Sequence, residues 1–211
     1  MWAVLATPLI AAAVARSPAA VLSQSETSAS SSTNSSTNCS TVRFNVTLSE
    51  GRTGTFDAVV SPDLAPIGAE RFTDLVQNEF FTDVAYFRVI EGFVAQFGIS
   101  GDPVVSAEWS SAVLADDPVL SSNYRGTISF ASAGEGTRTT QLFINLVDNT
   151  YPDAMGFAPF ATISEADMAI ADLLYSGYGD DVSQSKLESE GNAYLIENFP
   201  LLSYINSATC V

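Results

Sequence analysis

The stretch Tyr86–Asp102, YFRVIEGFVAQFGISGD, places one arginine and one glutamine in an otherwise apolar run that ends in a glycine-containing turn. Arg88 is one of only eight basic residues in the chain. Burying an unpaired charge is costly, and an arginine keeps its proton. The run therefore predicts either an edge strand whose Arg88 reaches water along its own stem, or a strand that presents Arg88 to a functional site.

The overall charge restricts the classes of partner. The 211 residues include 24 acidic and 8 basic side chains, which gives a formal net charge of -16. Such a charge repels phosphate backbones and anionic membrane surfaces. We therefore expect no nucleic-acid partner. The length and the 46% hydrophobic content are sufficient for one well-buried domain.

Missing residue types exclude several kinds of catalytic site. The chain has no histidine, which removes Ser-His-Asp and Cys-His arrangements, the HExxH zinc motif and imidazole metal ligands. Two cysteines are too few for a cysteine-rich zinc site, and neither the phosphate-loop motif nor the GxGxxG fingerprint occurs. The sequence thus predicts no metal and no cofactor.

The N-terminal region has the composition of a leader followed by a tether. Residues 1–22 contain a short apolar run that ends in Ala13-Val14-Ala15, which is typical of a signal peptide and too short for a stable membrane span. Residues 23–41 hold 13 serines or threonines among 19 residues and predict a disordered tether. Residues 42–211 are left as the one folded domain.

Sequons and cysteines point to the secretory route. Asn34, Asn38 and Asn45 each begin an N-x-S/T sequon, the acceptor pattern for glycosylation. Cys39 and Cys210 flank the folded part, so in an oxidising compartment we expect a disulfide between them. The alternative is two free thiols in a cytosolic protein. We favour a secreted protein or one in the lumen of the secretory pathway.

Hydrophobic patterning predicts several strands and two well-separated helices. A hairpin is expected from Val42–Leu48 and the alternating residues 56–60, with a helix from Pro66 to about Asn78. Ser164 is a candidate N-cap for a second helix that stops at Gly177. The other expected strands are Tyr124–Ala133, Gln141–Leu146, Phe157–Ile163 and a closing strand Phe199–Ile205. With no regular βαβ alternation, this pattern favours a closed barrel or a sandwich with helices at its ends.

Three segments carry a resemblance to a known family. In order they are FRVIEGFVAQFGISGDP (Phe87–Pro103), RGTISFASAG (Arg125–Gly134) and TRTTQLFIN (Thr137–Asn145). They resemble the signature blocks of the cyclophilin-type peptidyl-prolyl cis-trans isomerases over roughly Val42–Ala208. The segments Asn149–Phe160 and Gly191–Leu202 are similar to a branch with bacterial and secreted members. The resemblance implies a mainly β fold, a closed eight-stranded antiparallel β-barrel capped by two α-helices.

The resemblance also implies an activity: rotation of X-Pro peptide bonds in proline-containing polypeptides, by a monomer that needs no cofactor. The alternative is a binding module of the same fold, a scaffold or chaperone with negligible turnover. A glycosylated structural barrel is a third possibility. It does not explain why Arg88, Gln96 and Gln141 lie within apolar strands, since polar groups there are costly without a site to serve.

The resemblance assigns roles to individual residues. Arg88 matches the catalytic arginine, and Gln96 and Gln141 match the polar side chains that flank the substrate. The remaining matches are the walls of the proline pocket (Phe93, Val94, Phe143), the strand whose main chain pairs with the peptide (Ala131, Ser132, Ala133), and Tyr151 at the position of a tryptophan. Phe87, Val94 and Tyr151 depart from the best-known eukaryotic pattern, which has His, Met and Trp there. We therefore expect a different pocket rim.

Overall fold

The structure, a computed structural model, describes residues 39–211. The predicted leader, residues 23–38 of the predicted tether, and the sequons at Asn34 and Asn38 lie outside this part. The described residues begin at Cys39, and the first strand, β1, begins at Thr41. Within them, no helix has the length and apolar character needed to span a membrane.

The N-terminal hairpin consists of β1 (Thr41–Thr47) and β2 (Thr53–Val60), as expected from the alternating sequence. Val42, Phe44 and Val46 are all buried, because alternate side chains of a strand face the same side of the sheet. Phe44 lies opposite Phe56, with ring centroids 5.0 Å apart. The hairpin therefore supplies one wall of the core.

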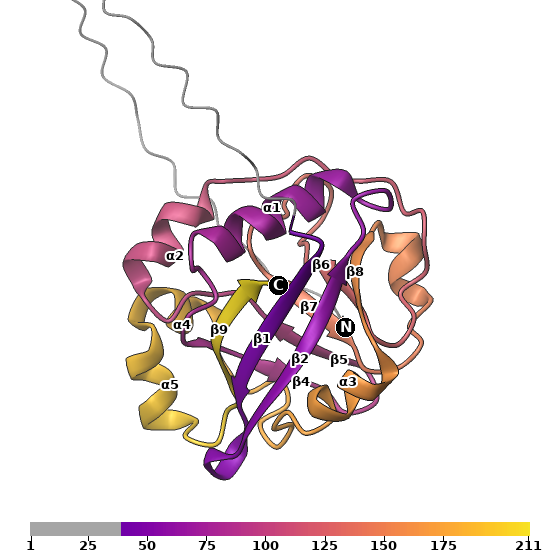
Figure 1. The fold of residues 1–211 in the computed structure, drawn as a ribbon. Coiled ribbons are helices and arrows are strands. Elements are labelled where there is room, and N and C mark those ends of the chain that lie inside the picture. Colours follow the sequence, from indigo (N-terminus) through magenta and orange to yellow (C-terminus); the bar gives the residue numbers. More distant parts are fainter. Residues whose placement is uncertain (1–38) are drawn as a thin grey trace, which may run out of the picture. The chain divides into compact units, whose positions relative to one another are not determined.

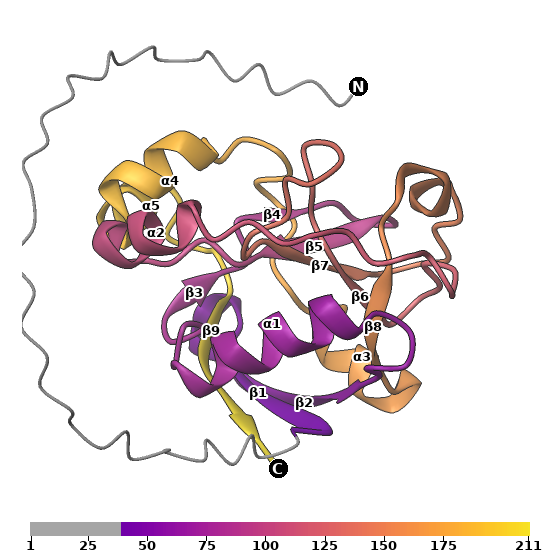
Figure 2. The same ribbon diagram turned by 90° about the horizontal axis from the view of Figure 1, so that it is seen from above.

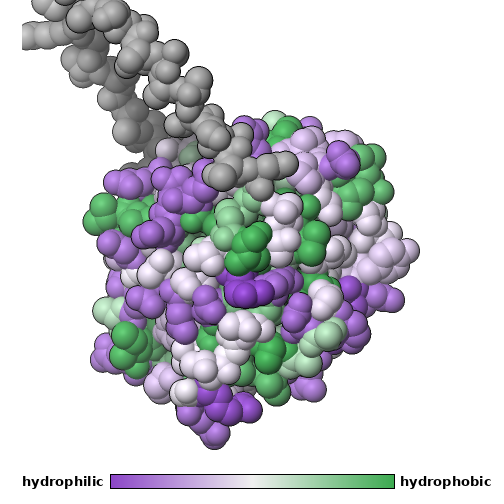
Figure 3. Space-filling model, viewed as in Figure 1, coloured by the Kyte–Doolittle hydropathy of each residue, from purple (hydrophilic) through white to green (hydrophobic). Residues whose placement is uncertain are grey.

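The outward side of this hairpin is polar. Arg43 donates two hydrogen bonds to the carboxylate of Asp57, at 2.8 and 2.7 Å. Asn45, the described sequon asparagine, donates its side-chain amide to Ser207 Oγ at 2.9 Å. Figure 3 shows this face, where hydrophilic side chains surround small, separate apolar areas.

Seven further strands complete a single sheet (Figure 1). They are β3 (Val84–Ala85), β4 (Arg88–Val89), β5 (Val94–Phe97), β6 (Thr127–Phe130), β7 (Leu142–Asn145), β8 (Pro159–Ile163) and β9 (Tyr204–Cys210). The order is β3-β9-β1-β2-β8-β6-β7-β5-β4, and every neighbouring pair is antiparallel. This confirms a mainly β antiparallel fold. The described part has nine strands, one more than expected, because the segment 84–89 supplies two short strands separated by Tyr86 and Phe87.

One predicted strand was wrong. The apolar run Phe199–Ile205 was expected to close the sheet, but the last strand is Tyr204–Cys210. Phe199 and Leu202 instead pack in a cluster with the C-terminal helices. The true strand has a weak apolar signal, since its inward residues Ile205 and Ala208 alternate with polar ones. The strand conformation of this segment therefore depends on its pairing with β1 and β3 more than on its own sequence pattern.

Two of the five α-helices in the described part begin where expected, but the second ends at Ala171, before the predicted stop at Gly177. Helix α1 (Pro66–Gln77) begins with a proline in its first turn, and α3 (Glu165–Ala171) is capped by Ser164, whose Oγ accepts from the Asp167 amide at 3.1 Å. The remaining helices are α2 (Pro103–Ser110), α4 (Gln184–Glu190) and α5 (Asn192–Asn198), with short 3-10 helices η1 (Ser49–Gly51) and η2 (Tyr151–Met155).

The core has an aromatic centre. Phe72 of α1 packs within 6.1 Å of Phe44 and 5.0 Å of Phe160, measured between ring centroids. Figures 1 and 2 show α1 over one opening of the curved sheet, and α2, α4 and α5 grouped at one side. A second cluster joins these C-terminal helices to the sheet through Phe87, Leu187 and Leu195.

A disulfide joins the first and last parts of the described chain. Cys39 and Cys210 are bonded, with Cα atoms 5.4 Å apart, as the sequence predicted. The bond lies beside the pairing of β1 with β9, in which Val42 is opposite Cys210. The cross-link therefore covalently joins the first and last strands of the described chain, which are neighbours in the sheet.

We predict that reduction lowers the free energy of unfolding by about 2 to 5 kcal/mol, because the bond closes a loop with a sequence separation of 171 residues and so restricts the unfolded chain. Urea denaturation with and without reductant measures this loss. The Cys39→Ser/Cys210→Ser double variant should match the reduced protein and respond to no reductant. Equal stability of the oxidised and reduced proteins would contradict the prediction.

Candidate functional site

A row of side chains crosses three strands on the outer face of the sheet. Arg88 of β4 lies opposite Gln96 of β5, and Gln96 lies opposite Phe143 of β7. Directly opposed residues of antiparallel strands face the same side, so these three side chains are neighbours. The alternate residues Ala95 and Phe97 point into the main core. The same strands thus serve the core with one face and the site with the other.

Beside this row is an apolar cluster separate from the main core. Val94, Phe143 and Phe157 are buried together, and Phe93 and Ala131 pack against them in part-exposed positions. The rings of Phe143 and Phe157 meet edge to face with centroids 5.5 Å apart. The structure therefore brings the three predicted pocket residues together and adds Phe157. A small apolar ring is the kind of group that such a cluster can hold.

Polar contacts connect Arg88 to both glutamines. The Gln96 side chain donates to Gln141 Oε1 at 2.8 Å, and Arg88 Nη1 lies 3.5 Å from Gln96 Oε1, at the long limit of a hydrogen bond. Gln96 is buried, so its amide needs these partners. The three polar residues that the sequence singled out therefore form one connected group.

Arg88 has a further partner that the sequence did not reveal. Its Nε donates to Asp180 Oδ1, a carboxylate from the turn between α3 and α4. The side chain of Arg88 is 17% exposed and that of Asp180 is 73% exposed. Asp180 lies in a polar segment with no motif around it, so only the tertiary fold places it at the site.

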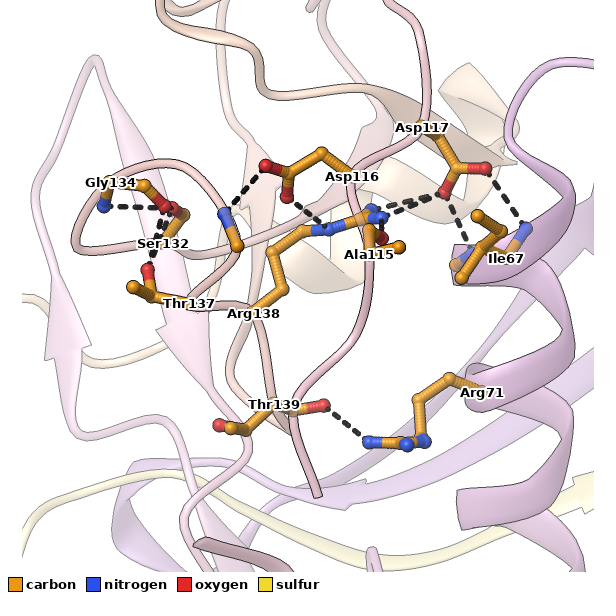
Figure 4. Close-up of polar contacts among 12 residues, drawn as sticks. Ile67, Arg71, Ala115, Asp116, Asp117, Ser132, Gly134, Thr137, Arg138 and Thr139 are labelled. Carbon is orange, nitrogen blue, oxygen red and sulfur yellow. Dashed lines mark hydrogen bonds and ion pairs between the residues drawn. The ribbon is translucent and has the colours of Figure 1, made fainter. Parts of the chain in front are cut away.

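The loop that follows β6 lies at the edge of the cluster. The Ala131 amide donates to the Gln141 carbonyl at 2.8 Å, which continues the pairing of β6 with β7. Ser132 Oγ accepts from the Gly134 amide at 3.0 Å (Figure 4), and Thr137 Oγ1 accepts from the Ala133 amide at 2.9 Å. The Ser132 side chain thus stabilises its own loop. Main-chain atoms are what this segment could offer to an extended peptide.

A buried ion-pair network supports this loop (Figure 4). The Arg138 side chain is 2% exposed and lies 3.1 Å from the carboxylates of both Asp116 and Asp117. Asp117 also accepts from the Gly68 amide at 2.8 Å, in the first turn of α1, while Asp116 accepts from the Gly136 amide at 2.7 Å. The network therefore ties the loop to the start of α1. Sequence reasoning did not identify it.

Two asparagine side chains, of which Asn123 is buried and Asn149 partly buried, hold the backbone on the other side of the cluster. The Asn123 side chain donates to the Phe157 carbonyl at 2.8 Å, and that of Asn149 donates to the Phe93 carbonyl at 3.0 Å. Asn123 also donates to Asp153 through its side chain and its main-chain amide. Burial would raise the pKa of Asp153, but these hydrogen bonds and one from Ser122 outweigh it, so the pKa lies below its ordinary value.

Tyr151 lies apart from this arrangement. It is the first residue of η2 and its surface is 72% exposed, whereas the buried members of the apolar cluster are Val94, Phe143 and Phe157. Phe157 is thus a candidate pocket residue that the sequence analysis did not list as a site residue. The segment GFAPF that contains Phe157 was already part of the family resemblance, so a signal for it was present.

Comparison with known proteins identifies the family. The family model for "Cyclophilin type peptidyl-prolyl cis-trans isomerase/CLD" matches residues 43–187. The chain belongs to this family. Its isomerase activity is therefore supported by the family and by curated relatives.

Three similar proteins illustrate the match. Peptidyl-prolyl cis-trans isomerase A of Dickeya dadantii is 27% identical over 71% of this chain and 76% of its own length. Peptidyl-prolyl cis-trans isomerase cyp15 of Rhizopus delemar is 32% identical over 44% of this chain, which spans only 15% of that protein. A solved cyclophilin-type isomerase of Cryptosporidium parvum superimposes with a TM-score of 0.56 at 18% identity, covering 82% of this chain and 97% of its own, and shares the fold.

The described residues contain no group of three or more His, Cys, Asp or Glu side chains arranged to hold a metal ion. The groups that the site presents are an arginine donor, two side-chain amides, an apolar cluster and the main chain of the loop after β6. Rotation of a prolyl peptide bond requires no nucleophile and no proton transfer, since the barrier of about 18 to 20 kcal/mol arises from lost amide resonance. These groups match that requirement.

We predict that Arg138→Met lowers the free energy of unfolding by about 3 to 5 kcal/mol, because it leaves Asp117 buried without its cationic partner. Chemical denaturation measures the change. Arg43→Met is the matched control: it removes an exposed ion pair to Asp57 and should change stability little. Equal losses of unfolding free energy in the two variants would show that the buried network stabilises the domain no more than an exposed ion pair does.

Proposed function

We propose that this domain catalyses cis-trans isomerisation of X-Pro bonds in proteins of the secretory pathway or the extracellular space, and that it acts as a monomer. The observation that carries the catalytic part is the row Arg88, Gln96 and Phe143 beside the apolar cluster. A charged donor fixed next to an apolar pocket suits a twisted prolyl amide, whose ring is apolar and whose nitrogen regains a lone pair.

The proposed roles follow from this placement. Phe93, Val94 and Phe143, with Phe157 added, hold the proline ring. The main chain of Ala131–Ala133 pairs with the extended substrate, while Gln96 and Gln141 orient the arginine and the peptide. Arg88 donates to the twisted amide. Tyr151, which is exposed on η2, contacts substrate residues that flank the proline.

We also propose that the sheet functions as a closed barrel. The strand order begins with β3 and ends with β4, and these strands are separated in the chain by Tyr86 and Phe87 alone. One short segment therefore supplies both ends of the sheet. Such closure would hold Arg88 of β4 rigidly, since a closed sheet has no free edge.

Arg88→Ala is expected to lower kcat/KM by about 100-fold or more, because a donor that acts on the twisted amide stabilises the transition state more than the bound substrate. A proline-isomerisation assay measures the rate, and peptide titration measures affinity, which should change little. Arg43→Ala, on the outward side of the hairpin, is the control for loss of one positive charge.

Two outcomes would contradict this prediction. If peptide affinity falls while turnover is preserved, Arg88 is a binding residue. If the wild-type protein is no faster than Arg88→Ala yet still binds proline-containing peptides, the domain is a binding module with negligible turnover.

The secretory location is supported by the Cys39–Cys210 disulfide and by the sequons at Asn34, Asn38 and Asn45. Expressed as the full chain in eukaryotic cells, the protein should appear in the medium or the secretory lumen. Glycosidase treatment should increase its electrophoretic mobility, and the triple Asn→Gln variant should not respond. A cytosolic protein with two alkylatable thiols would reject the proposal.

A further inference from the structure

The guanidinium of Arg88 is held from two sides. Gln96 Oε1 lies 3.5 Å from Nη1, and Asp180 Oδ1 accepts from Nε. The two acceptors come from different parts of the chain, since Gln96 is the strand neighbour of Arg88 and Asp180 is 92 residues away in sequence. Contacts on different nitrogens restrict rotation about the end of the side chain as well as its position.

The turn that carries Asp180 is itself packed. Tyr178, two residues before it, meets the rings of Tyr175 and Phe199 with centroids 5.0 and 5.1 Å away. The Asp181 amide donates to the Tyr178 carbonyl at 2.9 Å, which closes the turn. Val182, two residues after Asp180, is buried in the second cluster. Asp180 is therefore presented by a segment anchored on both sides.

Stability alone gives a weak reason for this pair. Asp180 is largely exposed, and exposed ion pairs contribute about 0 to 1 kcal/mol. A free arginine side chain carries about 2 kcal/mol of rotamer entropy, which must be lost each time it adopts one catalytic geometry. A partner that fixes the guanidinium before the substrate arrives removes this cost from the catalytic step.

We propose that Asp180 is a positioning residue for Arg88. Its carboxylate holds Nε and so fixes the plane of the guanidinium, with Nη1 on the Gln96 side. Asp180 acts through Arg88 and contributes to turnover more than to peptide affinity. This inference rests on the proposed isomerase function of the same site.

The test compares Asp180→Ala, Asp180→Asn and Asp181→Ala in the full-length chain. Asp181 is the matched control, because it is adjacent to Asp180 and exposed, and because its substitution by alanine removes the same charge. Asp180→Ala should lower kcat by about 10- to 100-fold with KM within about twofold, as expected for a misplaced catalytic group. Asp180→Asn keeps an oxygen acceptor and should recover part of the rate. Asp181→Ala should match the wild type.

A double-mutant cycle and a spectroscopic readout separate positioning from a structural effect. In an Arg88→Ala background, Asp180→Ala should cause no further loss, because its target is gone. The NMR signal of the Arg88 Nε–H should lose protection from solvent exchange in Asp180→Ala and keep it in Asp181→Ala. Circular dichroism and thermal unfolding confirm that each variant is folded.

The possible failures are distinguishable. Wild-type protein without isomerase activity would overturn the proposed function. Active wild-type protein with a slow Arg88→Ala variant and an Asp180→Ala variant as fast as the wild type would overturn only the positioning role. Equal losses in Asp180→Ala and Asp181→Ala, or an undiminished effect of Asp180→Ala without Arg88, would also reject it.

Discussion

The arrangement of the site depends on the alternation of side chains along β5 and β7. Ala95 and Phe97 enter the main core, while Val94 and Gln96 face the site from the same strand. Because the side-chain period of a strand is two residues, a slip of one residue would move the core set outward and the site set inward. The burial that stabilises the sheet thus also fixes the side on which the site residues lie.

Around these strands, several buried or partly buried polar side chains hold the backbone of the site. Arg138 and Asp117 connect the loop after β6 to α1, and Asn123 and Asn149 hold the backbone of Phe157 and Phe93. Buried polar groups are costly unless paired, and paired networks define one geometry. The Arg88 guanidinium is held in a similar way, by Gln96 and the exposed Asp180.

Local pattern predicted the elements that have their own signal. The β1–β2 hairpin, the proline at the start of α1 and the Ser164 cap of α3 could all be predicted from a few neighbouring residues. The last strand could not be predicted, because its sequence lacks a clear apolar pattern and its strand conformation depends on pairing with β1 and β3. The run Phe199–Ile205 carried that pattern, but Phe199 and Leu202 pack with α4 and α5 instead.

The sequence by itself determined the chemical groups of the site: one arginine and two glutamines in or beside apolar strands, in motifs that indicate the family. The tertiary structure decided which side chains surround them. It brought Phe157 into the apolar cluster, left Tyr151 exposed and placed Asp180 against Arg88. The physical reason is distance along the chain, since a contact across 92 residues leaves no local pattern and arises only when packed elements bring the partners together.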